Sequence, residues 1–571
     1  MCGIVGYFGT NHDNLYKNNA LKTILHRGGE NKKSLLDDNF YLGFTRLAIN
    51  DLHCNATSPF VDDGVIVACN GEIYNYKELN NQLKTYKMKS SNDTEIIINL
   101  YLEYGRKIEE VLKRIKGMFA ISLIDLKKNV AYLIRDQIGI KPFYYCIENN
   151  NLYYSSEIKT FKYIKEYCFK PNYEQLFRIL CYRSTSNAYT AFKNIYKVEP
   201  ATYIEVNLNN NHIKKKKYWY YPKYEPKKIS KKTIKQKITN IINQHTISDV
   251  PISTTLSGGL DSSIISAVVS KKNSNLCTFS SFYNVLGDET EKFELVKNYL
   301  NVKNEKVLID RDNFLKILNE LVYYMDEPFA DPAVLPLYFI SKAIHNKKIK
   351  LTIMGEGADE VFLGYKKYRE TIETNEFSFN DYIEKRSPFK LEQLKKMNYE
   401  LFDVFKKELD SIIKDYGFDK ITEKDVILNR LSQFDIERML PNLQLMRADK
   451  ATMVNTVEAR VPFLYTDTIS LAQQIKATRE ITLSNEKELL RDAFDKELPK
   501  EIIHGKKQIF FVPLDYLVDD KNKKVMINKI SDSKVIKKLI KIKEKGKIYN
   551  SLDSYQIWIL YMIALWEEKY L

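Results

Sequence analysis

The sequence predicts two domains of different fold class, an α+β domain followed by a doubly wound α/β domain. The chain has 571 residues, which is more than one hydrophobic core usually holds. Short apolar, β-branched runs dominate residues 1–206, whereas strand and helix patterns alternate from residue 233. Between them, residues 207–232 are polar, lysine-rich and interrupted by proline, as is typical of a domain boundary.

Six runs in the first domain favour β-strands, because they are apolar and often bounded by Asn, Asp or Gly. They span 4–9, 40–49, 64–75, 118–125, 129–136 and 143–157. Helical spacing marks 18–26 and 92–105. These strands could pair into two sheets, which gives the α+β prediction.

The second domain begins with an amphipathic helix at 233–245. Four strands are expected within 250–256, 276–283, 307–310 and 349–354, with helices between them, so the sheet should be parallel. Ligands of such sheets bind at the carboxyl ends of the strands. Residues 366–446 look entirely helical, and 555–571 form a final apolar helix of about core length.

Bulk composition is that of a globular protein, with 44% hydrophobic and 28% charged residues. The seven cysteines are odd in number and form no CxxC pair, which argues against a disulfide framework and a structural zinc site. No apolar run suits a membrane span, and the start lacks a signal-peptide pattern. We therefore expect a cytoplasmic protein with no membrane contact.

The net charge of +15 raises the alternative of a non-catalytic protein that binds nucleic acid. Lysine, asparagine, isoleucine and tyrosine are abundant along the whole chain, so a general compositional bias explains the charge. The densest lysine stretches, 214–217, 227–232 and 521–524, have the character of linker and solvated surface. We expect no nucleic-acid partner.

Cys2 follows the initiator methionine in the opening MCGIVGYFG. A lone cysteine is most often a small buried hydrophobe. Alternatively, removal of Met1 would leave a thiol and a free α-amine on one residue, and that amine could take the thiol proton. The second reading makes Cys2 an N-terminal nucleophile.

Two further blocks point to phosphate chemistry in the second domain. The loop Ser257–Ser263, SGGLDSS, follows a strand and opens a helix, so glycines and helix N–H groups can approach an anion. GEGADE at 355–360 places acids after another strand, as suits a magnesium–phosphate site. The alternative for SGGLDSS is an ordinary strand–turn–helix with a serine cap. The alternative for GEGADE is an acidic helix N-terminus, which the helix dipole favours. Asp326-Glu327 is a similar acidic turn, and nearby positive charge could come from Lys487, Arg491, Lys506 and Lys507.

In combination and order, these blocks resemble the glutamine-dependent asparagine synthetase family over nearly the whole chain. The shared motifs are MCGIVG, HRG (26–28), RLAI (46–49), NGEIYN (70–75), DTE (93–95), RDQIGIKPFYY, SGGLDSS, GEGADE, RADKATM and EARVPFL. The resemblance implies a class II glutamine amidotransferase domain of the N-terminal-nucleophile type at 1–206. It also implies a linker at 207–232 and an ATP-pyrophosphatase synthetase domain with helical C-terminal additions at 233–571.

For the first domain, the resemblance implies that Cys2 attacks the glutamine side-chain amide and releases ammonia. Asn70 and Gly71 would form the oxyanion hole, whose donors must point to the developing charge. Arg46 would bind the glutamine α-carboxylate, while Glu72 and Asp93 would hold its α-ammonium. The expected glutamine-binding residues are Arg46, Leu47, Ala48, Ile49, Asn50, Asn70, Gly71, Glu72 and Asp93.

For the second domain, the resemblance implies ATP and Mg²⁺ as cofactors. The expected ATP-binding residues are Leu256, Ser257, Gly258, Gly259, Asp261, Ser262, Ser281, Met354 and Gly355. Asp261 and Asp359 would hold Mg²⁺, and Glu356 and Lys487 would assist formation of an acyl-adenylate. Ammonia would reach that intermediate by an internal route. The resemblance is also compatible with a homodimer.

The chain departs from the family pattern at Gly29, Glu30, Met354, Leu363, Ile509 and Tyr465. The first two lie in a glutaminase-side loop and the rest near the synthetase site. Met354 replaces a usual serine, whose lost hydroxyl could loosen nucleotide binding. The catalytic positions are intact, so an active enzyme is expected. Its acceptor is expected to be L-aspartate, with another carboxylate, such as a uronic acid in surface-polysaccharide biosynthesis, as the alternative.

Overall fold

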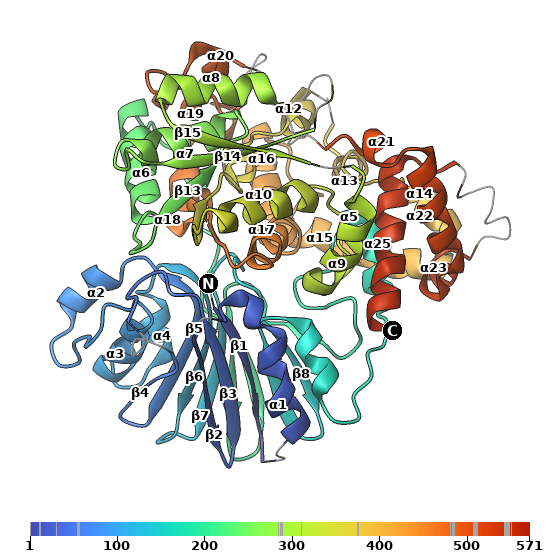
Figure 1. The fold of residues 1–571 in the computed structure, drawn as a ribbon. Coiled ribbons are helices and arrows are strands. Elements are labelled where there is room, and N and C mark those ends of the chain that lie inside the picture. The colour runs from blue at the N-terminus through green and yellow to red at the C-terminus, as the bar shows by residue number, and fades with distance from the viewer. Residues whose placement is uncertain are drawn as a thin grey trace.

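The computed structural model describes residues 2–10, 13–29, 31–53, 58–283, 285, 289–309, 311–373, 376–479, 481, 486–505, 512–541, 549 and 551–571. Figure 1 shows a layered β-rich part, coloured blue to cyan, below a helix-rich part coloured green to red. The two classes predicted from the sequence, an antiparallel α+β sandwich and a parallel α/β sheet, are both confirmed.

Two antiparallel six-stranded sheets form the N-terminal part. The first sheet runs in the order β10 (Tyr196–Lys197), β8 (Tyr144–Glu148), β9 (Asn151–Ser155), β1 (Gly3–Phe8), β3 (Phe40–Arg46), β2 (Asn31–Asp37). The second runs β12 (Ile213–Lys217), β11 (Thr202–Asn207), β7 (Val130–Arg135), β6 (Gly117–Asp125), β5 (Val65–Ile73), β4 (Phe60–Asp62).

A buried apolar layer joins the two sheets, with Phe8 and Leu42 from one and Ile66 and Leu133 from the other. The outer face of the first sheet packs on α1 (Asn14–Thr23) and η3 (Ile158–Tyr163). The outer face of the second packs on α2 (Tyr76–Gln82), α3 (Glu95–Glu103) and α4 (Ile108–Leu112). The result is a four-layer sandwich in which alternating strand residues fill two separate cores.

Several details differ from the sequence-based expectation, which did not include the strands β2, β4, β10 and β11. The run 143–157 is a hairpin, because Asn149 and Asn150 adopt positive φ values of 50° and 61° that suit a two-residue turn. Strand β12 lies inside the segment 207–232 that was expected to be a linker, which corrects the linker at its N-terminal end. Its lysines at 214–217 are exposed on a sheet edge, where charge discourages pairing with another chain.

The C-terminal part contains a five-stranded parallel sheet. Its order is β15 (Lys303–Leu308), β14 (Cys277–Phe282), β13 (Ile252–Thr255), β16 (Leu351–Ile353), β17 (Glu458–Arg460). The fifth strand, β17, was not expected, since three residues carry too little pattern to recognise. The chain leaves β13 toward β14 on one side and returns at β16 on the other. A topological switch point therefore lies between β13 and β16, where ligands of such sheets bind.

Helices cover both faces of this sheet. One face packs on α10 (Val334–Asn346) and α17 (Gln444–Met453), the other on α6 (Lys231–Gln244) and α7 (Leu260–Ser270). As predicted, the described residues of 366–446 form helices and turns, namely α12 (Lys366–Glu373), α13 (Phe379–Glu384), α14 (Leu391–Met397), α15 (Tyr399–Tyr416), α16 (Lys424–Phe434) and the π-helix η4 (Asp435–Met439).

The remaining helical elements are η1 (Leu25–Arg27), α5 (Tyr173–Tyr182), α8 (Thr290–Leu300), α9 (Phe314–Met325), α11 (Ala358–Val361), η5 (Pro462–Leu464), α18 (Thr466–Ala472), η6 (Ala477–Arg479), α19 (Glu488–Ala493), α20 (Lys500–Ile503), α21 (Leu514–Leu517), α22 (Asp520–Asp532), α23 (Lys534–Leu539) and α25 (Ser554–Tyr570). The apolar α25 is buried against α9 and α22. Across the described residues, none of the helices combines the length and apolar character needed to cross a bilayer.

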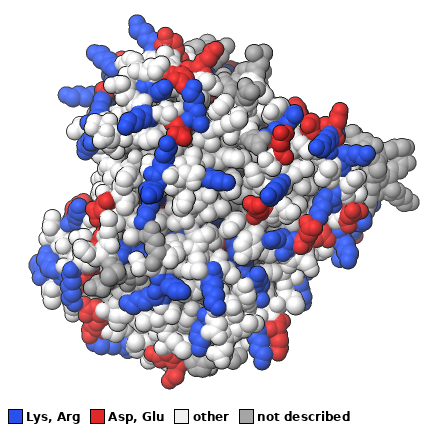
Figure 2. Space-filling model, viewed as in Figure 1, with Lys and Arg blue, Asp and Glu red and all other residues white. Residues whose placement is uncertain are grey.

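Charged side chains are dispersed over the face drawn in Figure 2. Lysines and arginines alternate there with aspartates and glutamates. The positive charge of the chain is therefore not gathered into a single stripe on that face.

Candidate active sites

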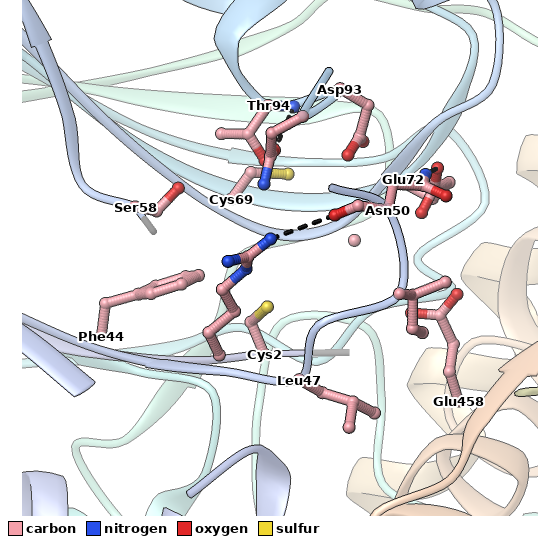
Figure 3. Close-up of a pocket in the computed structure, with 14 residues that line it drawn as sticks. Cys2, Phe44, Leu47, Asn50, Ser58, Cys69, Glu72, Asp93, Thr94 and Glu458 are labelled. Atoms are coloured by element: carbon pink, nitrogen blue, oxygen red, sulfur yellow. Dashed lines mark hydrogen bonds between the residues drawn. The ribbon is translucent and has the colours of Figure 1, made fainter. Parts of the chain in front are cut away.

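A pocket lies beside Cys2, where strands β1, β3 and β5 approach the loop before α3 (Figure 3). Its lining residues are Cys2, Phe44, Arg46, Leu47, Ile49, Asn50, Ser58, Cys69, Gly71, Glu72, Asn92, Asp93, Thr94 and Glu458. Most residues expected to bind glutamine are among them. Ala48 is buried beside Leu47, and Asn70 lies next to Gly71 on β5, but neither lines the pocket.

The backbone N–H of Cys2 donates a hydrogen bond to Asn70 Oδ1, with an N···O distance of 3.2 Å. The other amide atom of this side chain is Asn70 Nδ2. Nδ2 is buried and has no hydrogen-bond partner among the described residues. A buried donor without a partner is costly, so it marks a position where a ligand oxygen can bind.

Burial raises the pKa of the Cys2 thiol, although Arg46 and other nearby positive charge act in the opposite direction. The thiol is therefore protonated at neutral pH and needs a base before it can attack. Once Met1 is removed, the nitrogen that now bonds to Asn70 would be the α-amine of the same residue. The structure thus places one candidate base next to the thiol.

Two carboxylates share the other side of the pocket (Figure 3). Burial and the neighbouring Asp93 raise the pKa of Glu72 well above its usual value, despite the ion pair with Arg460. Burial likewise raises the pKa of Asp93 to about 6, although Asp93 accepts a 2.7 Å hydrogen bond from the Ile73 N–H. Two neighbouring buried acids favour a positively charged ligand group.

Arg46 places a guanidinium in the same pocket. It donates to the carbonyl oxygens of His53 at 2.8 Å and Asn50 at 3.0 Å, and also to that of Asp51. The side-chain amide of Asn50 donates to Glu72. A fixed cation on one side and two acids on the other match the two charged ends of a free α-amino acid.

Two residues of the C-terminal part complete this pocket, and the sequence reasoning assigned them no role. Glu458 lines it, entering from strand β17 (Figure 3). Arg460 Nη2 lies 2.9 Å from Glu72 Oε2. The only sequence signal was the motif EARVPFL, which contains both.

The second candidate site lies at the switch point between β13 and β16. Gly258 has φ +74°, and a Cβ there would lie 2.6 Å from the Phe293 nitrogen, so glycine is required. A Cβ on Gly355 would lie 3.0 Å from Asp261 Cβ. The two glycine-rich loops are therefore in direct contact, as the sequence predicted for the carboxyl ends of these strands.

Hydroxyl groups and backbone contacts order the loop that follows β13. Ser257 Oγ lies 3.1 Å from Ser262 Oγ, and the Gly259 N–H donates to Ser257 Oγ at 3.3 Å. Leu256 bonds through its N–H to Phe279 O at 2.8 Å, which brings β14 and its residue Ser281 alongside. These contacts group all the residues expected to bind ATP around the ends of β13, β14 and β16.

Lys487 joins the two loops. Its Nζ lies 2.6 Å from both carboxylate oxygens of Asp261 and 2.7 Å from Asp359 Oδ1. Two carboxylates thus converge on one cationic centre. Nearby, Arg447 pairs with Glu356 at 3.0 Å and with Asp331 at 2.5 Å.

Other residues singled out in the sequence lie elsewhere. Arg491 donates to the backbone carbonyls of Glu486, Ile502 and Ile503, so its charge is used inside the fold. Asp326 lies between the two parts of the chain, paired with Lys450 at 2.5 Å and Lys159 at 3.1 Å. Arg491 is nevertheless close enough to Asp261 for their charges to interact, whereas the acidic turn at Asp326 lies at the junction of the two parts.

The departures from the family pattern are placed as follows. Gly29 forms a bridge with Arg46, and Met354 donates its N–H to Arg460 O. Leu363 has φ +54°, and Tyr465 packs its ring against Tyr74 and His245. Glu30, Ile509, Lys506 and Lys507 lie outside the described residues.

Comparison with known proteins covers the whole chain. The glutamine amidotransferase domain model matches residues 1–219, and the asparagine synthase model matches residues 233–568. The chain is 28% identical to "Asparagine synthetase [glutamine-hydrolyzing] 1" of Bacillus subtilis, covering 100% of this chain and 96% of the relative.

Two further relatives cover less of the chain. "Putative asparagine synthetase [glutamine-hydrolyzing] 2" of Methanocaldococcus jannaschii is 32% identical over 64% of this chain and 76% of its own length. "Amidase chry2" of Gibberella zeae is 29% identical over 61% of this chain and 55% of its own length. Since the asparagine synthase model alone matches more than half of the residues, this chain belongs to the asparagine synthase family and carries a class II glutamine amidotransferase domain at its N-terminal side.

Proposed function

We propose that this protein hydrolyses glutamine at the Cys2 pocket and uses the ammonia to amidate L-aspartate, which ATP has activated at the second site. The products would be L-asparagine, L-glutamate, AMP and pyrophosphate. The observation that carries the proposal is the pairing, in one chain, of a pocket built for a free α-amino acid with a glycine-rich switch-point site of Asp261, Asp359 and Lys487.

In the glutaminase step, the α-amine of Cys2 accepts the thiol proton and the sulfur attacks the glutamine amide carbon. Asn70 Nδ2 and the Gly71 N–H would stabilise the oxyanion, a role supported by the lack of any other hydrogen-bond partner for the buried Nδ2 among the described residues. Arg46 binds the α-carboxylate, and Glu72 and Asp93 bind the α-ammonium. Ammonia leaves, and water releases glutamate from the thioester.

In the synthetase step, an oxygen of the acceptor carboxylate attacks the α-phosphorus of ATP. The bond to pyrophosphate breaks, and an acyl-adenylate forms. Ammonia then attacks the acyl carbon and AMP leaves. The loop Ser257–Ser263 offers hydroxyl and N–H groups to the phosphates, and Lys487 supplies a positive charge next to them.

Mg²⁺ fits the residues present, because Asp261 and Asp359 already converge on one cation, the Lys487 ammonium. These two carboxylates would hold it together with phosphate oxygens, as Mg²⁺ prefers. When bound, it would neutralise charge on the leaving pyrophosphate. Glu356, held by Arg447, lies beside this group and would orient the acceptor.

An alternative is the same chemistry on another carboxylate, such as a uronic acid in surface-polysaccharide biosynthesis. Family membership alone does not fix the acceptor, since one relative, similar over 61% of this chain, is named "Amidase chry2" and not an asparagine synthetase. We further propose that the segment 218–230, which has no regular secondary structure, separates the two catalytic domains.

The first test is pyrophosphate release with ATP, Mg²⁺ and glutamine, with and without L-aspartate. Release that depends strongly on aspartate and yields asparagine supports the proposal. Glutamine hydrolysis without aspartate-dependent pyrophosphate would reject aspartate and direct the assay to uronates.

Cys2→Ala tests the division of labour. The substitution should abolish glutamine-dependent synthesis and leave ammonia-dependent synthesis within about twofold, because the two sites use different residues. Cys69→Ala is the matched control, because Cys69 is the second thiol that lines the pocket, and this variant should keep glutamine-dependent synthesis. An electrophilic glutamine analogue should label the peptide that contains Cys2; labelling of Cys69 instead would show that the wrong nucleophile was assigned.

A further inference from the structure

The side chain of Arg460 belongs to one site and its backbone to the other. The guanidinium is fully buried, with Nη2 at 2.9 Å from Glu72 Oε2 and Nε at 2.7 Å from Glu458 Oε1. Its Nη1 donates to the carbonyl oxygens of His245 and Ile247 at 3.0 and 2.6 Å. These contacts engage every nitrogen of the guanidinium, so its orientation is fixed.

The backbone of Arg460 is part of the ATP-site sheet. Arg460 is paired with Ile353 across β17 and β16, and its carbonyl accepts a 2.9 Å hydrogen bond from the Met354 N–H. Met354 directly precedes Gly355 and Glu356, and Gly355 lies against Asp261. A movement of the loop after β16 must therefore act on the strand that carries Arg460.

In the Cys2 pocket, the Glu72 carboxyl group is held by its ion pair with Arg460. Burial and the neighbouring acid Asp93 both disfavour a charged Glu72, while the Arg460 guanidinium acts in the opposite direction and holds the carboxyl group in place. Asn50 provides the second contact to the carboxylate. The cation that pairs with Glu72 comes from strand β17 of the C-terminal sheet, 388 residues away in sequence.

We propose that Arg460 is a positioning residue that completes the glutamine pocket from the synthetase side and makes glutamine affinity respond to occupancy of the ATP site. This rests on the proposed roles of Glu72 and of the loop after β16. Arg460 touches neither substrate; it acts through the Glu72 carboxylate and through the Met354 hydrogen bond.

Arg460→Lys is the first variant, because lysine keeps the charge but cannot span Glu72, Glu458 and two carbonyls. The KM for glutamine should rise about tenfold, as expected for a lost charge-assisted hydrogen bond, while kcat for ammonia-dependent synthesis stays within about twofold. Retained ammonia-dependent synthesis also shows that the variant has folded. The control is Lys116→Met, which removes an exposed ion pair with Asp467, also between the N- and C-terminal parts. It should leave glutamine KM unchanged.

A double-variant comparison separates positioning from general stability. In a Glu72→Gln background, Arg460→Lys should change glutamine KM by less than twofold, since its route of action is already lost. Independent, multiplying effects of the two substitutions would overturn the positioning role. So would an unchanged KM in Arg460→Lys alone.

The response to ATP-site occupancy is tested in the unmodified enzyme. Glutamine KM in glutamine hydrolysis should differ severalfold with and without a non-hydrolysable ATP analogue plus Mg²⁺, and Arg460→Lys should abolish that difference. A difference that persists in Arg460→Lys, or none in the unmodified enzyme, would overturn the link. If the enzyme does not hydrolyse glutamine at all, the proposed function fails, and calorimetric glutamine binding to Cys2→Ala protein still decides the role of Arg460.

Discussion

Individual side chains in the glutamine pocket owe their chemistry to burial. Desolvation raises the pKa of the Cys2 thiol and of the Glu72 and Asp93 carboxyls. For an acid, a raised folded-state pKa means that the folded protein binds more protons than the unfolded chain between the two pKa values. The contribution of Asp93 to stability therefore falls as pH rises from its usual 3.8 to about 6. A ligand ammonium offsets this cost.

This protonation equilibrium predicts how glutamine use depends on pH. As pH falls through about 6, Asp93 takes up a proton and no longer attracts the glutamine ammonium, so kcat/KM for glutamine should fall. The profile of glutaminase kcat/KM from pH 5 to 8 measures this. Asp93→Asn should lower kcat/KM at pH 7.5 and flatten the acidic limb. An acidic limb that survives in Asp93→Asn would assign the titration to another group.

Among the elements, the short turn after α11 packs directly against Lys487 and Asp359, the side chains at the second candidate site. A Cβ on Gly364 would lie 2.0 Å from Lys487 Cε and 2.2 Å from Asp359 Oδ1. The preceding residue, Leu363, adopts φ +54°, an uncommon conformation for a bulky side chain. The turn is thus shaped to bring the backbone against the lysine that joins the two carboxylates.

Gly364→Ala should therefore displace Lys487 from Asp261 and Asp359. We expect a loss of ammonia-dependent synthesis of at least about a hundredfold, the scale seen when a preorganised charge is misplaced, with glutaminase activity retained. Pyrophosphate release and glutamate production, measured on the same preparation, check this. Gly105→Ala is the control. Its Cβ would meet nothing within 4 Å, so only the φ of +67° at Gly105 disfavours the substitution. It should lower stability by about 1 kcal/mol and spare both activities.

At the scale of the whole molecule, a buried ionic network ties the two catalytic parts together. Asp326 accepts hydrogen bonds from the backbone of Ile158 and Lys159 at 3.0 and 3.1 Å, and it pairs with Lys450 at 2.5 Å. Its carbonyl accepts a 3.0 Å hydrogen bond from Trp566 Nε1 of the last helix. The N-terminal sandwich, the parallel-sheet part and α25 thus meet at one residue, Asp326.

Asp326→Ala should destabilise the whole protein, because it leaves Lys159 and Lys450 buried without this acid. Removing one partner of a buried pair costs about 3–5 kcal/mol. Denaturant unfolding measures the loss, and glutaminase and synthetase activities should decline together, in contrast to Cys2→Ala. Asp326→Asn keeps an acceptor and should cost less. Selective loss of one activity in Asp326→Ala would show that the network serves a single site.

The fold classes, the two glycine-rich turns and the candidate nucleophile could be predicted from local patterns in the sequence, whereas the roles of the other site residues were implied only by the resemblance to a known family. Strand alternation, the glycine-rich turns after β13 and β16, and the cysteine after Met1 are patterns of a few neighbouring residues. The structure brings the expected residues into two clusters, around Cys2 and around Lys487. The hairpin at Asn149 and Asn150 was missed, although the polar residues 148–151 interrupt the apolar run and asparagine favours such a turn.

The sequence by itself determined the two fold classes, the candidate nucleophile and the order of the two catalytic parts, since each depends on short-range pattern and residue type. Only the tertiary structure decided that Glu458 lines the Cys2 pocket, that Arg460 pairs with Glu72 there, that Asp326 joins the two parts of the chain and that Arg491 bonds within the fold. Contacts of this kind join residues hundreds of positions apart, up to 388 between Glu72 and Arg460. No local pattern encodes such a contact, because it depends on how two separately folded sheets pack against each other.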